Sequence, residues 1–134
     1  MEIEGGCYCK AVRYKIQGEP MFRAQCHCRE CQYISGGAPN IVLGVPEDAF
    51  AYVKGSAKAF RRSDLERPVT REFCPECGTH LVSRAPGIPA VMIKVGTLDD
   101  PSVFGMPQMA IFTIDKQAFH WIPEGIPTFE RTPG

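Results

Sequence analysis

Cys74-Pro75-Glu76-Cys77-Gly78 is the stretch that decides how the rest of this chain folds. It places two thiols three positions apart, a spacing at which both sulfurs can bind one metal ion. The glycine that follows allows a tight turn in which backbone N–H groups point at the sulfurs. The pattern is typical of the metal-binding turns of zinc ribbons and rubredoxins, and it supplies two of the four ligands of a tetrahedral site.

The other two ligands are predicted near the start of the chain, in Cys7-Tyr8-Cys9, because the remaining three cysteines form a compact group of their own. A zinc site of four thiolates would join the beginning of the chain to its middle. Metal binding would then contribute directly to folding, on the order of 10 kcal/mol. Iron in place of zinc is one alternative at such a site, and a cluster without metal is the other.

The central group, Cys26-His27-Cys28-Arg29-Glu30-Cys31, offers three thiolates and no evident fourth ligand. Zinc sites with three protein ligands and an open position are the catalytic kind. Three thiolates give a zinc site a net charge of about −1, so bound water is acidified poorly, but an incoming thiol can be held as a nucleophilic thiolate. The pattern therefore favours thiol chemistry over hydrolysis.

Other interpretations of the central group stay open. One of the histidines His27, His80 and His120 could close it as a second structural site, although His27 would point away from the sulfurs in an extended segment. The group could also be without metal in the cell, or form a cluster of redox-active thiols. Arg29 could stabilise a thiolate or contact a substrate carboxylate, or it could simply be exposed to solvent.

Composition bounds the class of protein. The 134 residues favour a single domain, residues 1–134, and the formal net charge of zero gives no reason to expect nucleic acid or a membrane surface as a partner. The N-terminus lacks the features of a secretory signal, and the longest apolar runs are too short to span a bilayer. We expect a cytoplasmic protein, where seven clustered cysteines are metal ligands or catalytic thiols more often than disulfides.

Short runs of β-branched and aromatic residues alternate with turn signals, and 13 glycines and 12 prolines leave little room for long helices. We therefore expect a mainly β fold. A helical turn is predicted at 46–50, a strand end followed by a turn at 96–101, and an irregular tail from residue 123. The expected strands cover residues 11–16, 21–25, 40–45, 57–62, 69–73, 80–83, 90–95 and 109–113.

One basic stretch needs an interpretation of its own. Its acidic neighbours are Asp64, Glu66 and Glu72, which favours a solvated strand face, with an anion-binding site as the alternative. The basic residues concerned are Lys58, Arg61, Arg62, Arg67 and Arg71.

The order of these motifs resembles the glutathione-dependent formaldehyde-activating family, a group that includes the zinc domain of centromere protein V. The likeness covers nearly the whole chain. It is carried by the three cysteine motifs, by Gly36-Gly37-Ala38, by Val95-Gly96-Thr97-Leu98-Asp99-Asp100-Pro101 and by the tail at 121–129.

The resemblance implies a β-tent of antiparallel sheets that holds two zinc ions per chain. It also implies an activity that joins glutathione and formaldehyde into S-hydroxymethylglutathione, classed in reverse as a carbon–sulfur lyase. In this scheme a zinc-held thiol attacks formaldehyde, with His27 or a water as the proton donor. The structural zinc ligands would be Cys7, Cys9, Cys74 and Cys77, and the catalytic zinc ligands Cys26, Cys28 and Cys31.

Two functions of other classes remain as alternatives. One is a non-catalytic binding or scaffold module in which both metals are structural, because a zinc-stabilised fold can serve partner binding alone. The other is a thiol redox protein in which the cysteines at 26–31 oxidise reversibly.

Overall fold

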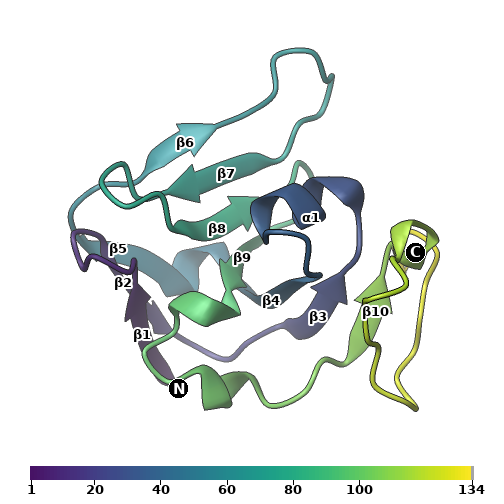
Figure 1. Cartoon of the computed structure of the whole chain (residues 1–134). Helices are drawn as coiled ribbons and strands as arrows, with labels where there is room; N and C mark the ends of the chain where they lie inside the picture. The colour runs from purple at the N-terminus through teal and green to yellow at the C-terminus, as the bar shows by residue number, and fades with distance from the viewer. Residues whose placement is uncertain (134) are drawn as a thin grey trace.

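Two β-sheets form the framework of the protein in a computed structural model that describes residues 1–133 (Figure 1). The smaller sheet has the strand order β1-β2-β5, and the larger has the order β10-β3-β4-β9-β8-β7-β6. Neighbouring strands pair antiparallel, except that β10 runs parallel to β3. The strands are β1 (Glu2–Gly6), β2 (Arg13–Gln17), β3 (Phe22–Cys26), β4 (Asn40–Pro46), β5 (Phe50–Lys54), β6 (Lys58–Phe60), β7 (Thr70–Phe73), β8 (His80–Arg84), β9 (Ala90–Lys94) and β10 (Met109–Ile111).

The prediction of a mainly β fold is confirmed, and every expected strand overlaps an observed one. Strand β1 was missed because its sequence, Glu-Ile-Glu-Gly-Gly, lacks the β-branched density of the others. Its glycines permit close approach of the sheet: a Cβ at Gly5 would lie 2.3 Å from the Tyr14 hydroxyl oxygen. Strand β5 and the helix α1 (Arg29–Ile34) were also not predicted.

The helical turn expected at 46–50 is the 3₁₀ helix η1 (Glu47–Ala49). The strand end expected at 96–101 lies slightly earlier, at Lys94, and the expected turn is a bend at 99–100 between two further 3₁₀ helices, η2 (Val95–Thr97) and η3 (Pro101–Phe104). The start of η3 has a local cause: Asp100 accepts a hydrogen bond from the Ser102 N–H while Pro101 occupies the first helical position. A last 3₁₀ helix, η4 (Thr113–Asp115), follows β10.

The core contains side chains from both sheets. Tyr14 and Ile16 of β2 are fully buried, as are Leu43 and Ile93 of the larger sheet. The Tyr14 hydroxyl lies 2.7 Å from the Thr97 hydroxyl, so the one polar atom of this large side chain has a partner. The smaller sheet thus packs on the larger one through an apolar layer.

The surroundings of the larger sheet include one helix, a projecting loop and the C-terminal segment. Helix α1 follows β3 and lies across the larger sheet, against β4, while the loop between β6 and β7 projects from the molecule (Figure 1). The last described segment, residues 123–133, contains no helix or strand, apart from a bridge between Thr128 and Ala110, and returns alongside β10. Residue 134 of the expected irregular tail lies outside the described residues. Among residues 1–133 no helix has the length and apolar character needed to cross a membrane.

Candidate metal centres

Four cysteines meet where turns from the two sheets come together. The turn between β1 and β2 provides two of them, and the turn between β7 and β8 provides the other two. Their sulfurs all lie within 4.8 Å of one another. The four residues are Cys7, Cys9, Cys74 and Cys77.

The spacing of these sulfurs fits a tetrahedral metal ion. Cys9 Sγ lies 3.6 Å from Cys7 Sγ and 3.7 Å from Cys74 Sγ. A tetrahedron with zinc–sulfur bonds of about 2.3 Å has edges of about 3.8 Å, whereas a disulfide bond measures about 2.0 Å. The sulfurs are therefore placed as ligands of a common ion, and they are too far apart to be bonded to each other.

Both turns are shaped so that backbone N–H groups point at sulfur. Cys74 Sγ accepts hydrogen bonds from the N–H groups of Glu76 and Cys77, at 3.3 and 3.5 Å. Gly78 takes a φ of 76°, in the left-handed region, which closes this turn. In the other turn Lys10 adopts a φ of 68°, a conformation that is uncommon outside glycine.

The four-sulfur cluster is partly open to solvent. Cys7 and Cys74 are buried, whereas Cys9 and Cys77 are exposed. The Thr79 hydroxyl lies 3.1 Å from Cys77 Sγ, and this hydrogen bond is the main reason why the pKa of Cys77 is lowered to about 5. The same hydroxyl oxygen accepts a hydrogen bond from the Tyr8 N–H, which ties the two turns together.

The other three cysteines meet at the end of β3. Their sulfurs also lie within 4.8 Å of one another, and no further Cys, His, Asp or Glu ligand atom of residues 1–133 joins this group. Cys26 and Cys31 are buried, and Cys28 is half-buried. Cys28 is also the residue that begins α1, since its Sγ accepts a hydrogen bond from the Cys31 N–H at 3.3 Å. The three-sulfur cluster is thus more accessible at Cys28 than at its two other cysteines.

A half-buried lysine lies close to the three-sulfur cluster. The register pairs Cys26 with Asn40 and Val42 with Lys94, so the Asn40 and Lys94 side chains share a face of the sheet. Lys94 Nζ donates to Asn40 Oδ1 at 2.6 Å, and Asn40 Nδ2 donates to Cys31 Sγ at 3.7 Å. Burial lowers the pKa of Lys94 to about 8, an effect that the nearby thiolates oppose.

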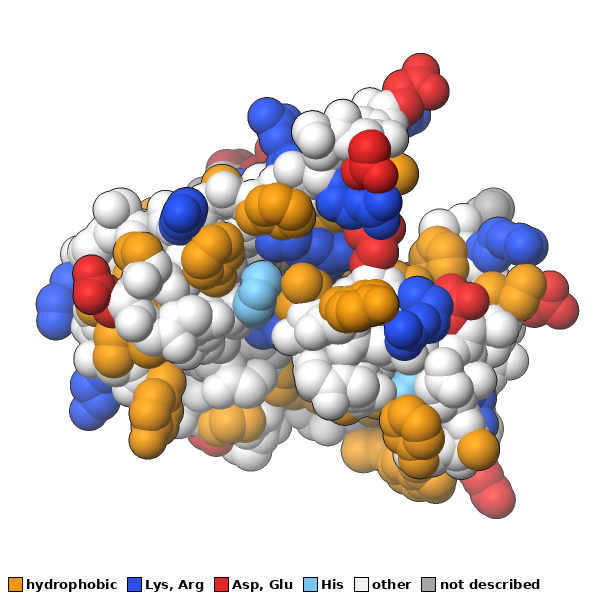
Figure 2. Space-filling view, turned by 45° about the horizontal axis from the view of Figure 1, so that its top comes forward, with side chains coloured by type: hydrophobic (Ala, Val, Ile, Leu, Met, Phe, Trp, Pro, Cys, Tyr) orange, Lys and Arg blue, Asp and Glu red, His pale blue; other side chains and the backbone are white. Residues whose placement is uncertain are grey.

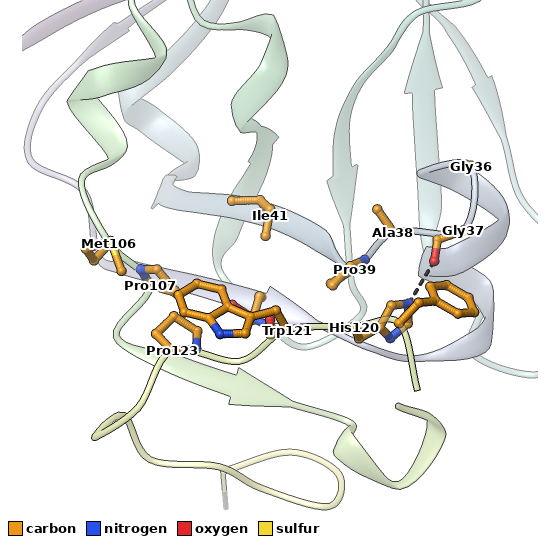
Figure 3. Close-up of a pocket in the computed structure, with 12 residues that line it drawn as sticks. Gly36, Gly37, Ala38, Pro39, Ile41, Met106, Pro107, His120, Trp121 and Pro123 are labelled. Carbon is orange, nitrogen blue, oxygen red and sulfur yellow. Dashed lines mark hydrogen bonds between the residues drawn. The ribbon is translucent and has the colours of Figure 1, made fainter. Parts of the chain in front are cut away.

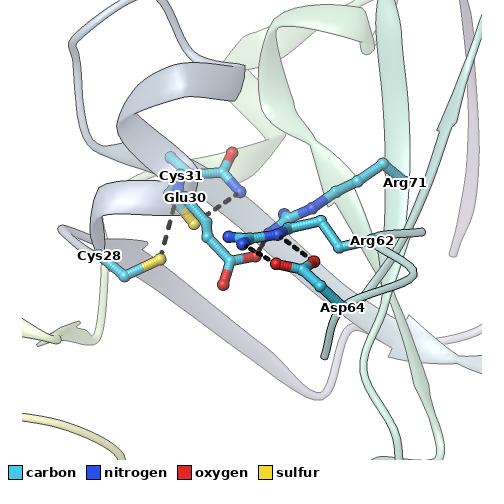
Figure 4. A network of polar contacts seen from close by, with 7 residues as sticks. Cys28, Glu30, Cys31, Arg62, Asp64 and Arg71 are labelled. Carbon is cyan, nitrogen blue, oxygen red and sulfur yellow. Dashed lines mark hydrogen bonds and ion pairs between the residues drawn. The ribbon is translucent and has the colours of Figure 1, made fainter. Parts of the chain in front are cut away.

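Arg71 is a second cation near the same cluster, and it is buried. It is 7% exposed, and its Nη2 lies 3.2 Å from Glu30 Oε1 (Figure 4). The prediction of a solvated strand face is therefore wrong at this position, because Arg71 faces α1 rather than solvent, whereas the four other basic residues of the stretch are exposed. The pKa of Cys31 is lowered to about 3. The main cause is the neighbouring sulfurs, and the charge of Arg71 is a further one.

Arg29, by contrast, lies on the solvent side of α1. Its guanidinium donates to Gln32 Oε1 and sits 5.0 Å from the centre of the exposed Tyr33 ring. No hydrogen bond among residues 1–133 joins Arg29 to a cysteine sulfur. The structure therefore favours the solvent-exposed alternative for this residue.

His27 and His120 belong to a buried hydrogen-bond chain whose proton positions can be deduced. His120 Nε2 lies 2.7 Å from the Gly37 carbonyl oxygen, which can only accept, so this nitrogen carries a proton. His120 Nδ1 then accepts from the Gln117 N–H at 3.1 Å and from His27 Nδ1–H at 3.0 Å. His27 Nε2 in turn accepts from the Gln25 side-chain amide at 2.9 Å.

The hydrogen-bond chain excludes both roles considered for His27, that of proton donor and that of metal ligand. Both ring nitrogens are in use, the residue is 0% exposed, and burial is the main cause that lowers its pKa to about 4. His27 therefore cannot act as the proton donor, and neither His27 nor His120 can close the three-sulfur cluster. His80 is not part of that cluster either, although its Nδ1 is the one buried side-chain polar atom of residues 1–133 without a hydrogen-bond partner.

The hydrogen-bond chain also shapes one side of an apolar groove with a volume of about 610 Å³. Gly36, Gly37 and Pro39 line it on one side, with His120 and Trp121 opposite (Figure 3). The Trp121 carbonyl accepts the second N–H of the Gln25 amide, at 2.9 Å, while its side chain is 70% exposed. The segment after η4 is therefore attached to the three-sulfur region through polar contacts that the cysteine spacing does not reveal.

The two cations beside the three-sulfur cluster and the hydrogen-bond chain of the histidines are not predicted from the sequence. One signal was present for Lys94, since it is the single charge in an otherwise apolar strand, Ala-Val-Met-Ile-Lys. No local signal pairs His27 with His120 or Arg71 with Glu30, because these contacts join residues that are 93 and 41 positions apart.

Comparison with known proteins supports the family resemblance that the order of the motifs indicates. The family model described as glutathione-dependent formaldehyde-activating enzyme matches residues 2–115. Proteins of Aspergillus flavus and Aspergillus oryzae, both provisionally named as glutathione-dependent formaldehyde-activating enzymes, are 29% identical over 91% of this chain and 67% of their own. A crystal structure of a Rhodobacter sphaeroides protein matches with a TM-score of 0.60 and 20% identity, covering 78% of this chain and 96% of that one, which supports the fold alone.

Proposed function

The chain belongs to the glutathione-dependent formaldehyde-activating family, and from this premise we propose that it is a zinc-dependent enzyme of the carbon–sulfur lyase type. Its reaction would join glutathione, or a related thiol, to formaldehyde or a similar small electrophile. The observation that carries this proposal is the three-sulfur cluster, which offers a metal three thiolates and leaves a fourth position for a ligand from solution.

The proposal assigns different duties to the two clusters. Cys7, Cys9, Cys74 and Cys77 would hold a structural zinc, and Cys26, Cys28 and Cys31 a catalytic one. Sulfur spacings near the edge of a zinc–thiolate tetrahedron support the first assignment. When bound at the second cluster, zinc would keep an incoming thiol in its thiolate form, the nucleophilic state of sulfur.

The protein's own groups prepare the second site in two ways. Cys26 and Cys31 are buried on the sheet side, so the half-buried Cys28 marks the side from which a thiol can approach. Lys94 and Arg71 bring positive charge to a cluster whose thiolates exceed the charge of a divalent ion. This charge would stabilise the deprotonated cysteines and an additional thiolate.

The bond changes are simple. The thiol loses its proton, a carbon–sulfur bond forms at the formaldehyde carbon, and the carbonyl oxygen takes up a proton to become a hydroxyl. Because His27 is sealed in its hydrogen-bond chain, we assign that proton to water. The reverse reaction breaks the carbon–sulfur bond and returns both components.

Residues 1–134 would form a single zinc-binding domain in this proposal, with the two zinc ions bound to one chain. A cytoplasmic location is part of it, because all seven cysteines are free of disulfides and the thiolate clusters need reducing conditions.

The test is the rate at which the zinc-loaded protein exchanges glutathione and formaldehyde with their adduct, measured by exchange NMR. The wild type should accelerate exchange over the uncatalysed rate, and Cys28→Ser should lower this acceleration on the order of 100-fold or more. Tyr8→Ser, at a 91% exposed position beside the other cluster, is the control and should keep full activity.

Equal acceleration by Cys28→Ser and the wild type would contradict the proposal. If the zinc-loaded wild type gave no acceleration at all, the binding-module alternative would take its place. Reversible loss of the Cys26, Cys28 and Cys31 thiols under mild peroxide would favour the redox alternative.

A further inference from the structure

A second, smaller cavity lies beside the three-sulfur cluster, between α1 and the segment that runs from β6 to β7. Its volume is about 180 Å³. The walls are largely apolar and include Ile34, Phe60, Leu65 and Val69, whereas Arg62 and Arg71 make up its basic part. Figure 2 shows the face on which this loop projects, where basic, acidic and hydrophobic side chains meet.

Arg71 has more hydrogen-bond donors than the protein uses. A guanidinium carries five N–H donors, and the one hydrogen bond that this side chain makes with residues 1–133 goes to Glu30. Glu30 is itself 48% exposed, so this carboxylate is shared with solvent. Because His80 Nδ1 is the one buried side-chain polar atom of residues 1–133 without a partner, the remaining Arg71 nitrogens reach solvent, where they are available to bind an anion.

The surroundings of Arg71 suit a carboxylate. Two parallel N–H groups of a guanidinium match the two oxygens of a carboxylate, and the resulting hydrogen bonds are about twice as strong as neutral ones. The largely apolar walls lower the polarity around the guanidinium, which strengthens such a contact. Arg62 also lines the cavity, but it is already paired with Asp64 and both side chains are at least half exposed (Figure 4), so recognition of an anion falls to Arg71.

Size decides how much of a ligand can enter. About 180 Å³ equals roughly six water molecules at about 30 Å³ each. Sites for whole small ligands measure about 300 Å³ or more, so this cavity holds an end-group only. Glu30, which lines the cavity, directly precedes Cys31, so the rest of such a ligand would lie at the three-sulfur cluster.

We propose that this cavity binds the carboxylate end of the thiol substrate, with Arg71 as the residue that recognises it. The inference rests on the proposed function and narrows its substrate class to thiols that carry a carboxylate. At Arg71 alone it replaces the predicted solvated strand face with an anion site, while the four other basic residues of the stretch remain exposed.

A pair of ligands tests this without altering the protein. The affinity of the zinc-loaded wild type for glutathione and for glutathione diethyl ester, whose carboxylates are neutralised, is measured by calorimetry. Glutathione should bind at least about tenfold more tightly, as expected for the loss of charge-assisted hydrogen bonds. Equal affinity for the acid and the ester would overturn the proposal.

Variants then show which residue causes the preference for glutathione over its ester. Arg71→Gln should bind acid and ester equally, whereas Arg13→Gln, which removes an arginine paired with Asp99 on the smaller sheet, should keep the preference. If Arg71→Gln does not fold, Val69→Glu replaces it, since a carboxylate in the cavity should weaken glutathione binding about tenfold and leave the ester unaffected. A preference that survives these changes would show that the carboxylate binds elsewhere.

Two further probes separate this inference from the proposed function. S-methylglutathione cannot form a thiolate, so a preference for it over its diester would support the carboxylate site whether or not thiols are activated. 2-Mercaptoethanol is a thiol that carries neither a carboxylate nor an amine. If it binds and reacts with formaldehyde as well as glutathione does, the enzyme proposal stands and the carboxylate site is overturned.

Discussion

The two cysteine clusters differ in what they connect. The four-sulfur cluster joins turns of two different sheets, and Cys9 and Cys74, whose sulfurs are 3.7 Å apart, lie 65 positions apart in the chain. The three-sulfur cluster is contained in residues 26–31, at the end of one strand and the start of one helix. A metal at the first restrains the whole fold, whereas a metal at the second restrains a segment that the sheet and α1 already hold.

Their surroundings differ in the same sense. Backbone N–H groups and the Thr79 hydroxyl surround the four-sulfur cluster, and two of its sulfurs belong to exposed residues. The three-sulfur cluster lies deeper, next to the half-buried Lys94 and the buried Arg71, and beside a cavity. Complete coordination and local hydrogen bonds are typical of a structural site, while an open position near buried charge is typical of a site that acts on a ligand.

The largest expected effect is on folding. Cys74→Ser removes a buried cysteine of the four-sulfur cluster, and we expect it to lower the free energy of unfolding on the order of 5 kcal/mol, or to prevent folding, because a metal bound there would contribute to stability. Cys28→Ser should change it by less than about 1 kcal/mol. Urea unfolding of both variants measures the difference, and similar losses for the two would break the comparison between the clusters.

The next effect concerns the histidine chain. His120→Ala would leave the buried His27 Nδ1–H and the half-buried Gly37 carbonyl without their partners, at a cost of about 2–3 kcal/mol. Because His27 lies between two cysteines of the three-sulfur cluster, zinc should also bind there about tenfold more weakly. Urea unfolding and competition with a chromogenic chelator measure the two quantities.

Trp121→Ala is the matched control for this prediction, since it removes a larger but 70% exposed side chain at the next position. Its unfolding free energy should stay within about 0.5 kcal/mol of the wild type. If both variants behaved alike, the buried chain would have no special part in supporting the three-sulfur cluster.

The smallest expected effect is electrostatic. Lys94→Met keeps most of the side-chain length but removes the positive charge, and zinc should then bind the three-sulfur cluster about three- to tenfold more weakly, while the four-sulfur cluster is unaffected. Lys15→Met, at a partly exposed ion pair with Glu2 on the smaller sheet, should alter neither affinity. A loss of zinc from both clusters in Lys94→Met would argue for general destabilisation instead.

Much of the fold follows from local sequence. Turn residues and β-branched runs predict most strands, because strand formation depends on short-range patterns that glycine and proline interrupt. The order of the cysteine motifs indicates which sulfurs meet, since two pairs at a distance and one compact triplet allow few tetrahedral combinations. Strand β1 escapes this reasoning, because its glycines are required by the close approach of Tyr14, a residue of another strand.

The site is less predictable than the fold. Arg71 belongs to a run of charges that local pattern places at the surface, but α1 covers it in the folded protein. The role of His27 depends on His120, which lies 93 positions away, and no spacing rule relates the two. Spacing therefore predicts the atoms that can hold a metal, whereas the charges and protons around that metal depend on tertiary contacts.

The zinc content per chain tests the central claim most directly. Native mass spectrometry of protein purified without chelator should find two zinc ions bound to each chain, one at each cluster, and Cys28→Ser should keep one of them. A wild type with a single zinc ion, or with none, would contradict the assignment of two metal sites with separate duties.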